Sequence, residues 1–347
     1  MRIEELDVLI QGAINTRRPF VCYTKPQNEE VVGVFQKDSK IYLTTNFSES
    51  GFVFAPFDET QNKSFYIPEN VSEKKIFHLS IDVKSHETNR HSDAFESKEI
   101  HEGLVNATVD KIKSSLLDKV VISRKEQVNT PKSPVILFTD LLEMYPNAFV
   151  YLWYHPETGL WLGATPERLV HVKEEKFKVM ALASTQEFQG TLDVEWGDKE
   201  KEEHQIVVDY IEDNLKAFNC KTSETYTVKA GNLLHLRADI SGDLNSKINL
   251  GQLISKIHPT PATCGMPKDV AKDFILKNEG YDREYYTGFL GEISQGLSDL
   301  YVNLRCMKYQ EDGLVSIFVG GGITKDSIPE KEWQETCIKS QVMKKVL

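Results

Sequence analysis

Short apolar runs, separated by polar and turn-forming residues, fill the first part of the chain and predict β-strands. The runs cover residues 31–36, 40–45, 51–57 and 64–69. A polar stretch, residues 82–101, then breaks the pattern and is the best candidate for a surface linker. The chain before this stretch is therefore expected to consist of short strands.

Helical and extended patterns alternate in the remainder of the chain. Helices are expected over residues 99–117 and 202–218, strands over 119–128 and 177–184, and hairpins over 148–172 and 299–322. Strands that come in neighbouring runs, with helices between the runs, favour an α+β fold with large, mostly antiparallel sheets over a doubly wound parallel fold. We expect a single domain.

Composition narrows the possible functions. The 347 residues are 40% hydrophobic, which is ordinary for a globular protein, and the net charge of −11 argues against a broad nucleic-acid-binding face. Five scattered cysteines without a CxxC pair argue against a disulfide framework and against structural zinc. The N-terminus lacks a signal-peptide core, and no apolar run could span a bilayer, so a cytoplasmic protein without membrane contact is expected.

The last helix carries charges on a stripe that later becomes apolar. At 100° per residue, Glu332, Glu335 and Lys339 share one face with Met343 and Val346. A solvated face would stay polar, and a core face would not begin with acids. The stripe predicts a helix whose start lines a cavity and whose end enters the core.

Glu203 likewise leads the apolar stripe of its own helix. Glutamates that converge from two helices suit a hard cation such as Mg²⁺, which prefers oxygen ligands. Glutamates at helix starts are also common as solvated groups that complement the helix dipole. Spacing alone leaves both interpretations open and favours the second.

A strand lysine and a turn glutamate are candidates for acid–base chemistry. Lys119 opens an apolar strand, where a lysine is usually an edge charge or a snorkelling side chain. In a dry cavity it could instead serve as a general base. Glu167 follows a tight turn and is either an exposed carboxylate or an acid kept protonated by burial.

Nine segments, taken together, resemble the chorismate-utilising enzymes, the family that includes isochorismate synthase, salicylate synthase, anthranilate synthase component I and aminodeoxychorismate synthase. The segments are DKVVISR, GATPERL, ALAST, KEKEEHQIVVDYI, LLHL, HPTPATCGMP, REYYTGFLG, YVNLRCM and GGGITKDSIPEKEWQETCIK. Each is weak alone, but nine in family order are highly specific. The resemblance implies one chorismate-binding domain over 1–347, with a variable N-terminal part (1–95) and a motif-bearing catalytic part (96–347).

The resemblance also implies a metal site. In this family the glutamates that match Glu203 and Glu335 bind Mg²⁺, which holds the ring carboxylate of chorismate. Glu332 matches a partner that acts through water. Lys339, one turn beyond Glu335, would balance charge beside that carboxylate.

Other matching residues are implied to bind the substrate. Arg305 and Tyr286 match the residues that hold the enolpyruvyl carboxylate, and the backbone of Gly320 and Gly321 would line the same pocket. His235 matches a pocket histidine, although a structural histidine is about as common. Chorismate is a dianion, so a net-acidic protein needs such local positive charge to bind it.

The reaction within the family is implied by the nucleophile. Lys119 matches the lysine that activates water for attack at ring C2, and Glu167 the acid that protonates the departing C4 hydroxyl. Enzymes of the anthranilate type use ammonia and lack this lysine. Salicylate synthases share both residues and then eliminate pyruvate. Ala262, where they usually have threonine, favours isochorismate as the product, while neighbouring Thr263 keeps the alternative open.

Some expectations rest on weaker signals. The family usually reads LAGT where this chain has LAST, and we expect the methyl group of Ala183, before Ser184, to change pocket shape in place of the usual glycine. A monomer is expected, because members without a glutaminase partner are often monomers. Isochorismate feeds menaquinone and catechol siderophore synthesis, and we favour menaquinone. A non-catalytic chorismate-binding sensor or subunit is the alternative from another class.

Overall fold

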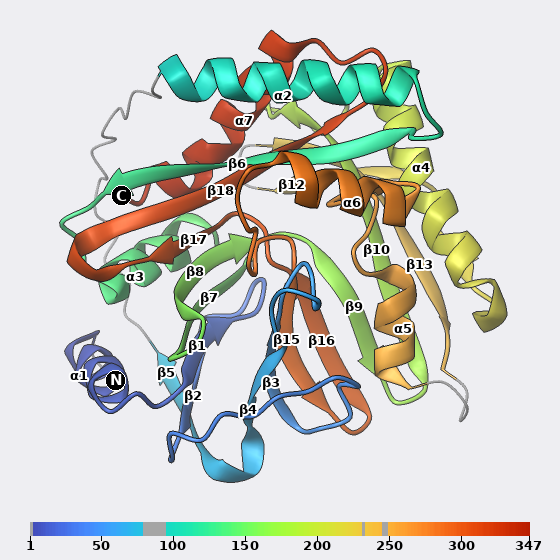
Figure 1. Ribbon diagram of the computed structural model, residues 1–347. Coiled ribbons are helices and arrows are strands. Elements are labelled where there is room, and N and C mark those ends of the chain that lie inside the picture. Colours follow the sequence, from blue (N-terminus) through green and yellow to red (C-terminus); the bar gives the residue numbers. More distant parts are fainter. Residues whose placement is uncertain (1–2, 79–94, 231–232, 245–248) are drawn as a thin grey trace.

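The computed structural model describes residues 3–78, 95–230, 233–244 and 249–347. Two large sheets pack against each other, and helices cover their outer sides (Figure 1). The helices in the described residues are α1 (Ile3–Asn15), α2 (Phe95–Lys113), α3 (Pro134–Met144), α4 (Asp198–Asn214), α5 (Leu250–Ile257), α6 (Lys268–Asn278) and α7 (Pro329–Lys344). None of these helices is both long and apolar enough to cross a membrane.

The first sheet holds both early and late strands of the chain. In spatial order its strands are β14 (Gly265–Met266), β6 (Lys119–Asn129), β18 (Leu314–Ile323), β17 (Cys306–Tyr309), β8 (Gly159–Thr165), β7 (Phe149–His155), β1 (Phe20–Thr24), β2 (Glu30–Gln36) and β5 (Ser72–His78). All of these pairings are antiparallel.

The second sheet is also antiparallel throughout its described pairings. In spatial order its strands are β11 (Lys221–Thr222), β13 (Leu233–Asp243), β10 (Lys176–Glu187), β9 (Arg168–Lys173), β16 (Leu297–Val302), β15 (Phe289–Ser294), β3 (Gly51–Ala55) and β4 (Phe65–Pro68), with β12 (Tyr226–Ala230) also paired to β13. The expected large antiparallel sheets are present.

Aromatic side chains fill the space between the two sheets. Phe149 of β7 stacks on Tyr301 of β16 with ring centroids 4.2 Å apart, and Phe54 of β3 stacks on Tyr285 at 4.4 Å. Stacked rings bury large apolar areas in offset geometry. Strands β1 and β7 are buried along almost their whole length, because helices cover the side away from this aromatic layer.

Two helices position polar residues between the sheets. The apolar stripe of α4, with Val207 and Ile211, packs on β10 and β13, so Glu203 lies one turn before the buried stripe. Helix α7 packs on β18 and ends with Met343 in the core of the first sheet. The start of α7 is therefore directed towards the same region as the start of α4.

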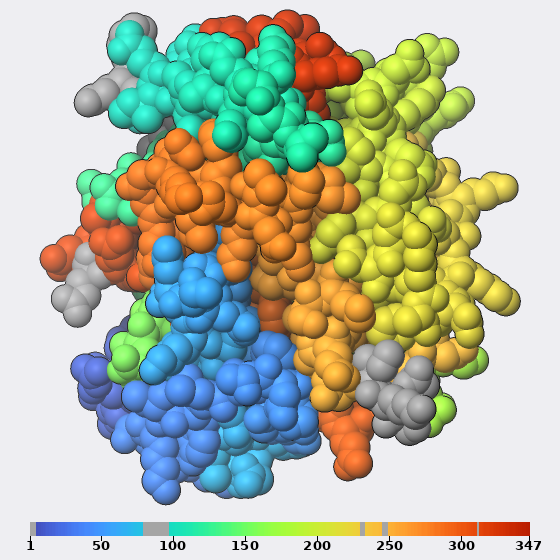
Figure 2. All heavy atoms as spheres, turned by 45° about the vertical axis from the view of Figure 1, so that its right-hand side comes forward, coloured from blue at the N-terminus to red at the C-terminus, as the bar shows by residue number. Residues whose placement is uncertain are grey.

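The segment after β3 is tied to the motif-bearing part of the chain. Asp58 is 2% exposed and pairs with Lys272 of α6, whose Nζ lies 2.8 Å from Asp58 Oδ1. The Phe57 N–H donates to the Glu284 carbonyl at 3.1 Å. Figure 2 shows this light-blue segment directly against the orange one. The N-terminal strands thus share both sheets and these contacts with later residues.

Several element predictions need correction. Residues 40–45 form no full strand; Leu43 makes an isolated bridge with Phe65, and the pairing ends there because the chain bends on both sides of the run. The chain before the polar stretch also contains a helix, α1. The expected linker 82–101 lies outside the described residues up to 94, and residues 95–101 open α2.

The hairpin expected over residues 299–322 is divided between the sheets. Its first strand, β16, ends at Val302 in the second sheet, and only β17 and β18 pair across the Glu-Asp-Gly turn. The expected helices are shifted: α2 and α4 each begin four residues earlier than the pattern indicated. Both helices begin within polar, acidic sequence, which apolar periodicity does not register.

Candidate active site

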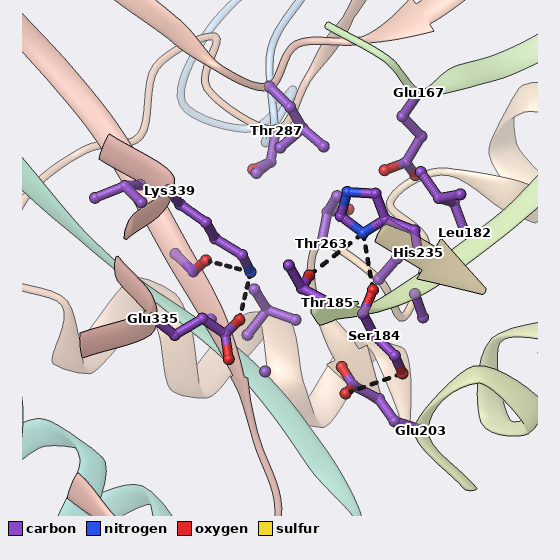
Figure 3. A pocket seen from close by; sticks show the side chains of 18 of the residues that line it. Glu167, Leu182, Ser184, Thr185, Glu203, His235, Thr263, Thr287, Glu335 and Lys339 are labelled. Atoms are coloured by element: carbon purple, nitrogen blue, oxygen red, sulfur yellow. Dashed lines mark hydrogen bonds and ion pairs between the residues drawn. The ribbon is translucent and has the colours of Figure 1, made fainter. Parts of the chain in front are cut away.

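One cavity lies where β18, α7, α4 and the ends of β10 and β13 meet. Twelve of the fourteen residues expected from the sequence line it. They are Glu167, Ala183, Ser184, Glu203, His235, Ala262, Tyr286, Arg305, Gly320, Gly321, Glu335 and Lys339. Figure 3 shows Glu167 and His235 on one side, opposite Glu335 and Lys339. The other two, Lys119 and Glu332, are buried beside the cavity and bonded to residues of its wall.

The glycines of β18 make room for charged side chains. A methyl group on Gly322 would lie 2.8 Å from Glu203 Oε1 and 2.8 Å from Lys119 Cε. A methyl group on Gly320 would lie 3.1 Å from the Tyr286 hydroxyl oxygen. Contacts under 3.0 Å are not tolerated at a Cβ, so a larger residue at Gly322 would displace the pair of side chains. Gly320 and Gly322 are therefore required for space, whereas a methyl group on Gly321 would make ordinary contacts.

Three lysine–glutamate pairs surround the cavity. They join Lys119 Nζ to Glu203 Oε1 at 2.7 Å, Lys199 Nζ to Glu332 Oε1 at 3.2 Å, and Lys339 Nζ to Glu335 Oε1 at 2.5 Å. Lys119 is fully buried, and its ammonium group lowers the pKa of Glu203 although burial alone would raise it. Burial raises the pKa of Glu332, against the opposing effect of Lys199. Buried carboxylates need such partners to stay ionised.

The three glutamates of these pairs offer the type of ligand that a hard cation prefers. All three border the glycine run: a methyl group on Gly322 would meet Glu203, and one on Gly321 would lie 3.7 Å from Glu335 Oε1 and 3.9 Å from Glu332 Oε2. Carboxylate oxygens are the preferred ligands of Mg²⁺. Within the described residues, no three His, Cys, Asp or Glu side chains lie close enough to hold a metal ion. Each glutamate is held by its lysine, so the donors are present but not assembled.

Glu167 is a buried acid at the cavity wall. It lies in the turn between β8 and β9, is 5% exposed, and its backbone accepts a hydrogen bond from the Val302 N–H at 2.9 Å. Burial raises the pKa of Glu167 to about 8, although the charges of Lys119, Arg305 and Lys339 oppose the shift. A carboxyl group with this pKa is mostly protonated at neutral pH and can donate a proton.

Cationic and hydroxyl groups converge at the bend that connects the two sheets. Arg305 has a left-handed backbone, with φ of 47°, directly after β16 leaves the second sheet. Burial lowers the pKa of its guanidinium group, which remains charged at any ordinary pH. Tyr286 lies against Phe318, with ring centroids 5.6 Å apart. Lys339 also donates to the Gly320 carbonyl at 3.2 Å.

The hydrogen bonds of His235 fix its tautomer. Nδ1 lies 2.8 Å from the Ser184 carbonyl oxygen, which can only accept, so Nδ1 carries the proton. Burial lowers the pKa of His235 to about 3, so the ring is neutral. Nε2 is then an acceptor, and it has no partner among the described residues. The pocket histidine can accept a hydrogen bond from a bound molecule.

The residue that replaces the family glycine is Ser184, and not Ala183 as expected from the sequence. Ser184 has a left-handed backbone, with φ of 63°, and it is the third residue of LAST, where LAGT has glycine. Glycine adopts this conformation without strain, whereas a residue with a Cβ does not. The residue that departs from the family at the glycine position is therefore Ser184, and Ala183 has an ordinary strand environment in β10.

Sequence reasoning missed four polar residues of the cavity wall, Thr185, Lys199, Glu200 and Thr287. A signal for Glu200 was available. Helix α4 carries Glu200 and Glu203 with the same Glu-x-x-Glu spacing that α7 has in Glu332 and Glu335. The spacing three residues apart puts both members of each pair on one helix face. Lys199 is recognisable only from its contact with Glu332 on the other helix.

The site defines a class of protein before any relative is considered: an enzyme-like, partly basic pocket with a buried acid, a buried lysine and carboxylates suited to a divalent cation. The model of the chorismate binding enzyme family matches residues 33–347, and the chain belongs to this family. Isochorismate synthase EntC of Escherichia coli (strain K12) is 29% identical over 313 residues, which cover 83% of this chain and 78% of that protein.

Solved structures agree on the fold. DhbC from Bacillus anthracis superposes with a TM-score of 0.80 at 22% identity and covers 98% of each chain. Anthranilate synthase component I from Streptococcus pneumoniae TIGR4 gives a TM-score of 0.70 at 18% identity, with 94% of this chain and 92% of that one covered. The family resemblance and the α+β fold like that of anthranilate synthase component I, both inferred from the sequence, are confirmed.

Proposed function

We propose that the protein is an isochorismate synthase, which converts chorismate reversibly to isochorismate. The observation that carries the proposal is a buried lysine, Lys119, and a buried acid, Glu167, around a cavity that also presents Arg305 and Lys339. Family membership supports the substrate. The name of the relative EntC supports the reaction.

In the proposed mechanism, two residues move protons. Once its ammonium group has given up a proton, Lys119 accepts a proton from water as the water oxygen forms a bond to ring C2. The double bonds of the ring shift, the C4–oxygen bond breaks, and protonated Glu167 gives its proton to the departing hydroxyl, which leaves as water. A pKa of about 8 keeps Glu167 in the donor form at neutral pH. A pair of this kind requires no oxidant or reductant.

Binding of the dianion is assigned to residues on both sides of the cavity. Arg305 and Tyr286 would hold the enolpyruvyl carboxylate, and Lys339 would balance the ring carboxylate. Glu203 and Glu335, with Glu332 acting through water, would hold Mg²⁺. The ion would orient the ring carboxylate and neutralise its charge. Menaquinone and catechol siderophore synthesis would both take the same product.

The test is an incubation of the purified protein with chorismate and Mg²⁺, with products separated by chromatography. We expect a chorismate–isochorismate mixture that disappears with EDTA and falls at least about 100-fold in rate with Lys119→Ala. Lys201→Ala, an exposed lysine on α4, is the matched control and should behave like the wild type.

Two outcomes would contradict the proposal. Salicylate and pyruvate would assign the salicylate synthase reaction and show that Ala262 does not stop the sequence at isochorismate. If the wild-type protein binds chorismate but leaves it unchanged, the protein belongs to the binding-only class.

A further inference from the structure

Ser184 is a strained residue at the cavity wall. Its φ of 63° lies in the left-handed region, which residues with a side chain rarely adopt, and it is 6% exposed. The register of β10 against β13 shifts between Ala183 and Gln186, so Ser184 lies in a bulge. Bulges near active sites commonly redirect a side chain. Strain of this kind persists where the surrounding structure uses it.

The bulge directs the Ser184 hydroxyl group towards the start of α4. Its Oγ lies 2.6 Å from the Glu200 carbonyl oxygen. It also lies 3.4 Å from Glu203 Oε2, and Figure 3 draws this contact. A hydroxyl group has one proton, and the shorter contact to the carbonyl takes it. The lone pairs of Oγ therefore face an ionised carboxylate oxygen. Oγ thus keeps lone pairs that can accept a hydrogen bond close to that carboxylate.

We propose that Ser184 is a further residue of the divalent-cation site and accepts a hydrogen bond from a water bound to the ion at Glu203. The inference rests on the proposed function, because it takes Glu203 as a metal ligand. Mg²⁺ keeps several of its waters when it binds proteins, and these waters donate strongly to nearby oxygens. Residues that hydrogen-bond the coordination shell commonly change metal affinity.

The family pattern LAGT supplies no side chain at this position, so the hydroxyl oxygen is a feature of this chain. It also explains why a strained serine stands where glycine would be relaxed. The same residue orients His235 through its backbone carbonyl, at 2.8 Å from Nδ1. That bond is made by the backbone and remains in any variant at this position.

The test measures Mg²⁺ binding to the metal-free protein by isothermal titration calorimetry, independently of activity. Ser184→Ala removes the hydroxyl group and keeps the strain, whereas Ser184→Gly removes both. We expect both variants to bind Mg²⁺ about three- to tenfold more weakly than the wild type. In the metal-free state, Ser184→Gly should melt about 1–3 °C above Ser184→Ala, because only glycine relieves the strain.

A matched control separates strain from metal binding. Glu174 also has a left-handed backbone, with φ of 57°, in the exposed turn between β9 and β10. Glu174→Gly should therefore change thermal stability but leave the Mg²⁺ affinity at the wild-type value.

The outcomes distinguish this inference from the proposed function. If the wild type binds no Mg²⁺, the metal part of the proposed function is wrong, and this inference is wrong as well. If the wild type binds Mg²⁺ and both variants bind it equally well, only the role of Ser184 is overturned. Weaker binding by Ser184→Gly alone would trace the effect to backbone freedom and would also overturn it.

Discussion

The carboxyl group of Glu167 sets the alkaline limit of the proposed reaction. Its pKa of about 8 results first from burial, against the opposing charges of three cationic side chains. The folded protein therefore holds the proton more tightly than the unfolded chain does. The stability that this group contributes is fully present below its ordinary pKa near 4.5 and is lost as the pH rises through about 8.

The rate of isochorismate formation should fall as the pH rises through about 8, because Glu167 must be protonated to donate. Initial rates at saturating chorismate across pH 6 to 10 would measure this limb. Glu157→Gln changes an exposed glutamate on the β7–β8 turn and should leave the profile unchanged. A rate that is constant up to pH 10 would contradict the role of Glu167.

Replacing the acid itself gives a second test at this scale. Glu167→Gln keeps the shape of the side chain but cannot protonate a leaving hydroxyl group, so the rate should fall by about 10²- to 10⁴-fold. Binding of chorismate, measured by calorimetry, should change little. A variant that retains more than a tenth of the wild-type rate would remove Glu167 from the proposed mechanism.

At the residue scale, sequence motifs located the site residues but not their partners. Lys119 and Glu167 were found because their motifs match a family. The contact between Lys119 and Glu203 joins residues 84 positions apart, and the pair of Lys199 with Glu332 joins residues 133 apart. No periodicity reports such pairs, because they depend on how two helices approach one strand.

Among the elements that form the cavity, strand β18 has little room for added volume. Gly322→Ala would place a methyl group 2.8 Å from both Glu203 Oε1 and Lys119 Cε. We expect a loss of about 1–3 kcal/mol in unfolding free energy, typical of overpacking, together with loss of activity. Chemical denaturation and product assays would measure the two effects.

The control for this variant is a glycine with free space. Gly103 lies in helix α2, and no atom lies within 4 Å of a methyl group placed on it. Gly103→Ala should stabilise the protein by about 0.5–1 kcal/mol, because alanine favours the helix, and leave activity unchanged. Equal behaviour of the two variants would show that β18 accommodates a side chain after all.

The segment that follows helix α6 holds the strand that carries Lys119. Arg283 is 2% exposed, and its guanidinium group donates to the Val121 carbonyl at 2.6 Å, to the Thr263 carbonyl at 2.9 Å and to Glu279. It thereby ties the strand β6 to the loop that contains Ala262.

Arg283→Met should therefore destabilise the protein by about 3–5 kcal/mol, because Glu279 would remain buried without its partner. Urea denaturation would measure this. Lys277→Met breaks an exposed pair with Asp273 on helix α6 and should have a small effect. A small effect of Arg283→Met would mean that Glu279 finds another partner or becomes protonated.

Elements were predictable from the sequence where one pattern held over a whole run. Strands β7 and β8 have continuous apolar runs joined by a turn, and both were found. The run from Asp299 to Gly322 looks equally continuous, yet it passes from one sheet to the other at residues 303–305. The left-handed backbone of Arg305 makes this change of direction possible, and nothing in the apolar pattern marks it.

At the scale of the whole molecule, the cavity lies where the two sheets meet two of the helices that cover them. Three of its lysines pair with three glutamates, so these charges balance each other. A net charge of −11 would otherwise repel a dianionic substrate. Mg²⁺ would add positive charge in this cavity and connect α4 to α7 through Glu203 and Glu335.

Ion binding in this cavity should stabilise the whole fold, because a ligand that binds only the folded state adds to its unfolding free energy. At 100 times its dissociation constant, Mg²⁺ should contribute about 2.7 kcal/mol. The melting temperature should rise with Mg²⁺ concentration and return to its starting value with EDTA. Glu335→Gln should abolish the rise, whereas Glu330→Gln, an exposed residue in the first turn of the same helix, should retain it. A wild-type protein whose melting temperature ignores Mg²⁺ would mean that the lysines alone neutralise these glutamates, and that chorismate would have to bind to the site as it stands.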